Sequence, residues 1–153
     1  FSPPEQFSAH RKSELGATAD IYSLGATIYD ALAGRAGGGP CVHVELSGDL
    51  SDLRPALEAG LYRLAQESVT NARRHARNAS RIELSVEGLP DRVVLRVRDD
   101  GAPLPGAPRR EGGFGLVGMA ERARLLGGTF RAGPAEPGGW LVQAELPRRA
   151  VLP

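Results

Sequence analysis

Four stretches of the chain carry patterns of apolar and polar residues that are typical of β-strands. RIELSVEG (81–88) and RVVLRVRDD (92–100) alternate strictly, which indicates strands with one buried face. CVHVEL (41–46) also predicts a strand. The stretch TFRAGPAEPGGWLVQAEL (129–146) predicts a hairpin with a loose Gly/Pro turn.

Two stretches instead repeat their apolar residues at helical spacing, 51–76 and 116–128. Gly127 stands where the second helix is expected to end. Strands separated by helices and followed by a terminal hairpin predict an α/β (α+β) two-layer sandwich, a mixed β-sheet covered by helices on one face.

The two predicted helices each have one face of small or apolar residues. In the first these are Leu61, Ala65, Ser68, Val69, Ala72 and Ala76, and in the second they are Leu116, Met119, Ala120, Ala123 and Leu126. The residues expected largely on the other side of the first helix are Arg63, Gln66, Arg73, Arg74 and Arg77.

A glycine-rich string, GRAGGGP (34–40), divides the chain into two unlike parts. Before it, residues 20–33 predict a helix that is apolar on two faces. We therefore expect an N-terminal segment (1–36), a flexible joint (37–40) and one domain (41–150).

Composition excludes several classes of protein. The 153 residues are 41% hydrophobic, and 19 basic residues balance 18 acidic ones, so nothing predicts a nucleic-acid surface. Cys41 is the single cysteine, which excludes an internal disulfide or a cysteine zinc cluster. No apolar run approaches the roughly 18–20 residues that a membrane span needs.

Three polar residues form a stripe along the first helix of the domain. Glu67, Asn71 and His75 follow one another at steps of four, at the edge between the apolar and the charged faces. For such a triplet alone, an ordinary polar helix edge with a hydrogen-bonded histidine is the alternative. Metal-assisted phosphoryl transfer would use this stripe, because an amide oxygen suits Mg²⁺ and a nearby carboxylate can orient or deprotonate an attacking group.

Two further features suit a nucleotide. Asp99 has the parity of the inward residues of its strand, where a carboxylate needs a donor such as the exocyclic amine of adenine, and Gly101 lets a ligand approach the backbone. The glycine-rich GGFGLVGM (112–119) opens onto a helix, whose free N–H groups favour an anion.

These motifs together resemble an ATP-binding superfamily. ESVTNARRHA resembles its N box, DDGAP its G1 box and GGFGLVGM its G2 box, and the resemblance covers roughly residues 41–147. The superfamily includes sensor histidine kinases, type II topoisomerases, Hsp90 chaperones and mismatch-repair ATPases. The amino-acid sequence of these motifs is most similar to that of bacterial sensor kinases that serve nitrate-regulator-type response regulators.

The resemblance implies a role for each matching residue. Glu67 would be the catalytic acid or base, Asn71 the Mg²⁺ ligand, and Asp99 with Gly101 would bind adenine. The remaining residues that would border the nucleotide are His75, Ala76, Gly113, Gly115, Leu116, Gly118 and Met119. A lid would span about 102–112, where Pro103 replaces a glycine that is usual in the family, so we expect a stiffer lid.

The N-terminal segment resembles a different family. FSPPEQF and ADIYSLGATIYDALAGR are similar to the end of the activation segment and the following helix of bacterial eukaryotic-type Ser/Thr kinases, with Glu5 and Asp20 at its structural acids. The nucleotide loop, the lysine and the catalytic aspartates of that family have no counterpart in this segment, so no Ser/Thr kinase activity is expected.

The resemblance implies the ATP-binding catalytic domain of a two-component histidine kinase. It would position Mg·ATP so that a phosphoryl group is transferred to a histidine on a separate phosphoacceptor domain. That domain would pass the phosphoryl group to a response regulator. The alternative is a degenerate nucleotide- or partner-binding regulatory module; a chaperone- or topoisomerase-like ATPase is disfavoured because it would need a further domain to complete its site. We expect a cytoplasmic domain, whose parent can be membrane-anchored, and a homodimer through residues 20–33.

Overall fold

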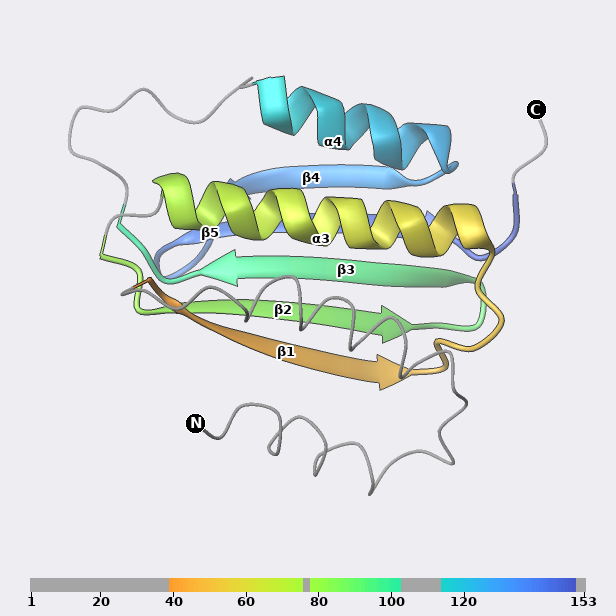
Figure 1. The fold of residues 1–153 in the computed structure, drawn as a ribbon, viewed down its shortest axis with the longest axis horizontal. Coiled ribbons are helices and arrows are strands. Elements are labelled where there is room, and N and C mark those ends of the chain that lie inside the picture. Colours follow the sequence, from red (N-terminus) through yellow and green to blue (C-terminus); the bar gives the residue numbers. More distant parts are fainter. Residues whose placement is uncertain (1–38, 76–77, 103–113, 151–153) are drawn as a thin grey trace.

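The computed structural model describes residues 39–75, 78–102 and 114–150. In this part of the chain, five strands form one sheet in the order β1-β2-β3-β5-β4 (Figure 1). The strands are β1 (Cys41–Gly48), β2 (Arg81–Gly88), β3 (Arg92–Asp99), β4 (Thr129–Pro134) and β5 (Trp140–Pro147). β1 runs parallel to β2, whereas the pairs β2–β3, β3–β5 and β5–β4 are antiparallel. The predicted mixed sheet is confirmed.

Two helices of the described part, α3 (Pro55–His75) and α4 (Phe114–Leu125), lie on the same face of the sheet (Figure 1). Between them and the sheet lies one apolar core. Its largest fully buried side chains are Leu50, Leu57, Leu61, Leu64, Val69, Ile82, Leu84, Val86, Leu95, Met119 and Leu146. The two-layer sandwich predicted from the sequence is therefore confirmed, and none of the described helices is long and apolar enough to cross a membrane.

The first helix of the domain begins at Pro55, and the predicted start at residue 51 was wrong. Proline suits the first helical position, because its φ is already helical and it has no N–H to satisfy. The carbonyl of Arg54 accepts the N–H groups of Leu57 (2.9 Å) and Glu58 (3.0 Å). The apolar residues before the proline belong to a turn, where Leu50 and Leu53 are buried without being helical.

The second helix ends where glycine was expected to stop it, although its bounds are Phe114–Leu125 rather than 116–128. The N–H of Gly127 bonds to the carbonyl of Arg124, and that of Gly128 bonds to the carbonyl of Ala123, both at 2.9 Å. This pattern is a Schellman motif, and it requires the positive φ of 83° that Gly127 adopts.

The face of the sheet away from α3 and α4 carries paired charges. Arg96 pairs with Glu87 at 3.4 Å and Arg92 pairs with Glu145 at 3.3 Å. Val94 stands directly between Glu87 and Glu145 in the sheet and is only 2% exposed. Long charged side chains can cover an apolar residue with their aliphatic stems, so this face needs no second layer at Val94.

One end of the sheet is fixed by two arginines. The guanidinium of Arg148 donates to the carbonyls of Leu89 (2.7 Å), Ser51 (3.1 Å) and Asp49. Arg54 donates in turn to the carbonyl of Arg148 at 3.0 Å. These bonds hold together the connections at the end of the sheet where β1 and β2 finish, and they leave the opposite end for the polar residues of the predicted site.

The predicted N-terminal helix (20–33) and most of the joint lie outside the described residues, so their arrangement stays a prediction. The same holds for Ala76, Gly113 and the predicted lid from Pro103 onward.

Candidate functional site

Four elements meet at the end of the sheet opposite Arg148. The C-terminal half of α3, the first turn of α4, the last residue of β3 and the first residue of β5 all lie at this end (Figure 1). Successive strands and helices run in opposite directions (Figure 1), so each of these four elements begins or ends at this end of the sheet. The topology therefore brings together residues that are far apart in the sequence.

The first turn of α4 passes directly over the predicted stripe of α3. A Cβ placed on Gly115 would lie 3.3 Å from both the Asn71 Nδ2 and the Glu67 Oε1 atoms. Glu67 and Asn71 are both half-buried, which fits their predicted place at the edge of the helix. Because the first N–H groups of a helix have no partner within it, this turn presents donors beside a carboxylate and an amide.

Asp99 is buried at the end of β3, as its parity predicts. It is 3% exposed, and its Oδ1 atom accepts the backbone N–H of Gly101 at 3.0 Å. Gly101 is itself buried. The chain therefore turns tightly around this carboxylate, with the glycine backbone against it.

The adjacent carboxylate, Asp100, has a different role. It accepts the backbone N–H groups of Ser80 (2.9 Å) and Arg81 (3.0 Å) and the hydroxyl of Ser80. The hydrogen bond from the Ser80 hydroxyl, with that from the Arg81 amide, lowers the pKa of Asp100 below its ordinary value. Asp100 thus fixes the beginning of β2 to the end of β3 and leaves Asp99 as the buried carboxylate of the site.

Along α4, the residues assigned to the site divide between core and surface. Met119 is 1% exposed, and its Sδ atom accepts the hydroxyl of Ser68 at 3.4 Å. Met119 therefore takes part in the packing between α3 and α4, and its place beside the nucleotide stays a prediction. Leu116 is partly buried against the core, and Gly118 is exposed, with no protein atom within 4 Å of the place that a Cβ would take.

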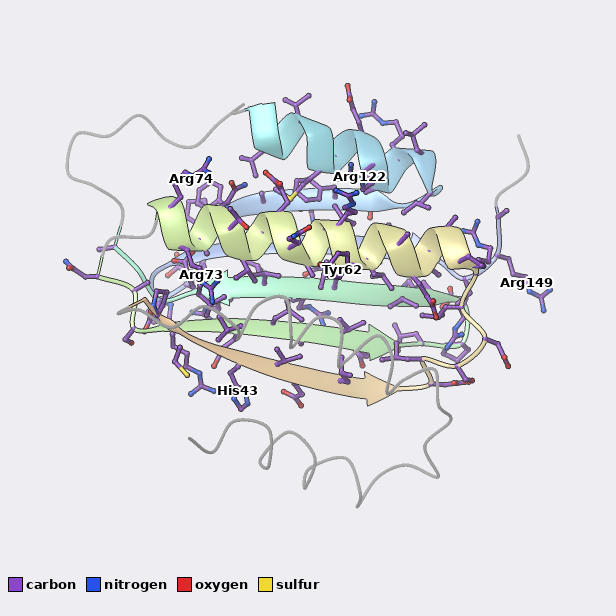
Figure 2. All side chains as sticks on the ribbon, in the orientation of Figure 1. His43, Tyr62, Arg73, Arg74, Arg122 and Arg149 are labelled. Atoms are coloured by element: carbon purple, nitrogen blue, oxygen red, sulfur yellow. The ribbon has the colours of Figure 1, made fainter. Side chains whose placement is uncertain are left out.

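The structure corrects the predicted side of one basic residue of α3. Arg74 follows Asn71 by three positions, which puts it on the same side of a helix, whereas the sequence analysis expects it largely on the other side. Figure 2 shows Arg74 and Arg73 on opposite sides of α3, with Arg74 on the side of α4. Its spacing of three positions from Asn71 is the signal in the sequence that indicates this side. The side chain of His75 lies outside the described part of the structure.

The polar set at this end fits a magnesium ion shared with a phosphate ligand. Among the described residues, no three His, Cys, Asp or Glu side chains gather in a group that could hold a metal ion. Mg²⁺ commonly uses only one or two protein oxygens, with waters and phosphates completing its shell. The half-buried amide of Asn71, beside the carboxylate of Glu67, offers such a ligand.

The sandwich and these residues define an ATP-binding domain. Residues 56–150 match the family described as histidine kinase-, DNA gyrase B- and HSP90-like ATPases, and the chain belongs to this family. ATP is accordingly the ligand of the domain.

The sequence relatives include sensor proteins and histidine kinases. The chain is 44% identical over 77 residues to the methanol utilization control sensor protein MoxY of Paracoccus denitrificans, covering 48% of this chain and 17% of that protein. It is 36% identical over 109 residues to the histidine-protein kinase/phosphatase UhpB of Salmonella typhimurium, covering 71% and 21%. The chain therefore spans about a fifth of the length of these relatives.

Solved structures share the fold. The ATP-binding domain of PrrB from Mycobacterium tuberculosis aligns with a TM-score of 0.59 at 25% identity, covering 85% of this chain and 95% of that one. The blue-light activated histidine kinase of Erythrobacter litoralis EL346 aligns with a TM-score of 0.65 at 21% identity, covering 82% and 40%. Domains of histidine kinases thus have the same arrangement of sheet and helices.

Proposed function

We propose that residues 41–150 bind Mg·ATP and present its γ-phosphate to a histidine on a separate domain. The observation that carries the proposal is the approach of Gly115 to within 3.3 Å, measured from a Cβ position, of the polar atoms of Glu67 and Asn71. This approach puts the donors of a helix N-terminus next to a carboxylate and an amide oxygen. Anions bind readily at such a terminus.

Each residue would act on a different part of the ligand. The carboxylate of Asp99 would accept the exocyclic amine of adenine, and the backbone at Gly101 would leave room for the base. The N-terminal turn of α4 and the guanidinium of Arg74 would offset the charge of the phosphates. Glu67 would orient or deprotonate the attacking imidazole.

Asn71 would be the protein ligand of the magnesium ion. When bound, the ion would neutralise charge on the phosphate oxygens and fix their geometry for transfer. The carbonyl oxygen of the Asn71 amide supplies a hard ligand without adding a negative charge, which favours a site that must also accept a polyphosphate.

The acceptor and the next step belong to other parts of a signalling system. The relatives include a sensor protein and a histidine-protein kinase/phosphatase, and this supports a phosphoacceptor histidine domain and a response regulator as partners. A supply of ATP favours a cytoplasmic position for the domain. The N-terminal segment resembles part of a Ser/Thr kinase but would contribute no activity of its own.

An equilibrium titration tests the nucleotide site. A fluorescent ATP analogue is added to the full chain with and without Mg²⁺, and unlabelled ATP is used to displace it. We expect saturable binding that tightens with Mg²⁺ and is reversed by ATP. Binding that neither responds to Mg²⁺ nor is displaced by ATP would contradict the proposal.

A further inference from the structure

Trp140 stands directly beside the buried carboxylate of the site. It is the residue opposite Asp99 in the antiparallel pair of β3 and β5. Residues in that position point to the same face of a sheet, with Cβ atoms about 4.5–5.5 Å apart. Along β5, the alternate residues Val142, Ala144 and Leu146 are buried under the helices, so Trp140 also faces the helices.

The backbone that carries Trp140 is held firmly against β3. Gly139 has a φ of 89°, and a Cβ at this position would collide with the carbonyl oxygen of Asp99. Arg98 donates to the carbonyl of Glu136 at 2.7 Å and fixes the turn that leads into β5. The position of the indole relative to Asp99 is therefore set by the fold.

The two neighbours of Asp99 across the sheet differ in exposure. Ile82, opposite Asp99 on β2, is 0% exposed, so that side of the carboxylate is closed. Trp140, on the β5 side, is only partly buried and packs against the edge of the core. Of these two neighbours, only the tryptophan leaves surface that a ligand can contact.

We propose that the indole of Trp140 forms one wall of the base-binding part of the site and contacts the purine. This inference rests on the proposed function, since it assumes that a base lies at Asp99. Aromatic rings bind the face or edge of any base, whereas a buried carboxylate discriminates between bases by their hydrogen-bonding groups. Trp140 would therefore supply affinity, while Asp99 would supply selectivity.

The fluorescence of Trp140 provides the first test, because it is the only tryptophan of the chain. ATP and inorganic tripolyphosphate are titrated separately, with Mg²⁺, while calorimetry measures ATP binding in parallel. We expect ATP to change the emission with the affinity that calorimetry gives, and tripolyphosphate to leave it nearly unchanged. Calorimetric binding of ATP without a change in emission would overturn this inference and leave the proposed function intact. Absence of ATP binding by calorimetry would overturn both.

Three variants provide the second test. Trp140→Val removes the ring but keeps a strand-forming residue, and we expect it to weaken ATP binding on the order of tenfold without weakening tripolyphosphate. Trp140→Phe should keep most of the affinity. Phe130→Val is the matched control, since Phe130 is also a partly buried aromatic on the helix side but pairs with Ala144, away from Asp99. Equal ATP affinity in Trp140→Val and the native chain would contradict the inference.

Discussion

Asp99 and Asp100 are neighbours in sequence with different surroundings, because Asp99 is the last residue of β3 and Asp100 follows the strand. Asp99 is buried on the helix side, where its surroundings suit a ligand with a donor group. Asp100 is exposed and binds the N–H groups that begin β2. A single-residue change can therefore separate the two roles.

We predict that Asp99→Asn weakens adenine nucleotides selectively. An amide can present its own donor to the exocyclic amine, and such a buried mismatch costs roughly 1–3 kcal/mol. Affinities for ATP and GTP are measured by displacement of a fluorescent analogue. Equal weakening of both nucleotides would indicate that Asp99 is only structural.

Asp100→Asn is the control for this prediction, because it should affect folding rather than selectivity. The pKa of Asp100 is lowered in the folded protein, so its carboxylate stabilises the fold above its ordinary pKa and loses this effect as the pH falls through the lowered value. The variant should therefore be less stable than the native chain near neutral pH, and the difference should shrink in acid. Chemical denaturation at several pH values measures it.

At the scale of the elements, the two glycines of α4 have different surroundings. A methyl group on Gly115 would press on Glu67 and Asn71, whereas one on Gly118 would meet no protein atom within 4 Å. Gly115→Ala and Gly118→Ala make the same chemical change in the same helix, so they form a matched pair.

We predict that Gly115→Ala weakens ATP binding by displacing the two polar side chains. Gly118→Ala should raise the melting temperature, since alanine is favoured over glycine within a helix by roughly 0.5–1 kcal/mol. Any loss of ATP affinity in Gly118→Ala must come from contact with the nucleotide itself. Thermal melts and calorimetry check both variants. If Gly118→Ala is destabilised while Gly115→Ala binds ATP normally, the different surroundings assigned to the two glycines are contradicted.

The sequence predicted the places of Asp99, Glu67 and Asn71 because the patterns that place them are local. Strand alternation turned Asp99 inward, and helical spacing aligned Glu67 with Asn71. Hydrophobic periodicity does not indicate where α4 crosses α3. The burial of Met119 and the difference between Gly115 and Gly118 depend on that crossing. The neighbour of Asp99, Trp140, lies on a strand that is not consecutive with β3, so its position required the strand order.

At the scale of the whole molecule, the question is which surface the predicted helix of residues 20–33 packs against. Fully burying one of the residues Ile21, Leu24, Ile28 and Leu32 would contribute about 1.5–3 kcal/mol, which favours a buried position for the predicted helix. A short isolated helix is marginal in water. The alternatives are packing on the ATP-binding domain or pairing with a second copy, and we favour the second.

We predict that the full chain is a dimer and that a version beginning at Gly38 is a monomer. Glycine-rich linkers restrict the direction of a chain little, so from the composition of residues 34–40 we expect that each copy can reach its partner. Light scattering over a range of concentrations measures the mass of both versions. If both are monomers of equal stability, pairing through residues 20–33 is contradicted.

The measurement that tests the central claim most directly is calorimetric titration of ATP into the native chain and Asn71→Ala, each with and without Mg²⁺. The central claim is that the end of the sheet where α3 meets α4 holds Mg·ATP through Asn71. Arg63→Ala, an exposed change on the same helix, serves as the control. We predict that Asn71→Ala loses Mg²⁺-dependent binding while its melting temperature and the binding by Arg63→Ala are unchanged, because Asn71 lies at the edge of the packed face. An Asn71→Ala variant with native ATP affinity and native dependence on Mg²⁺ would contradict the account.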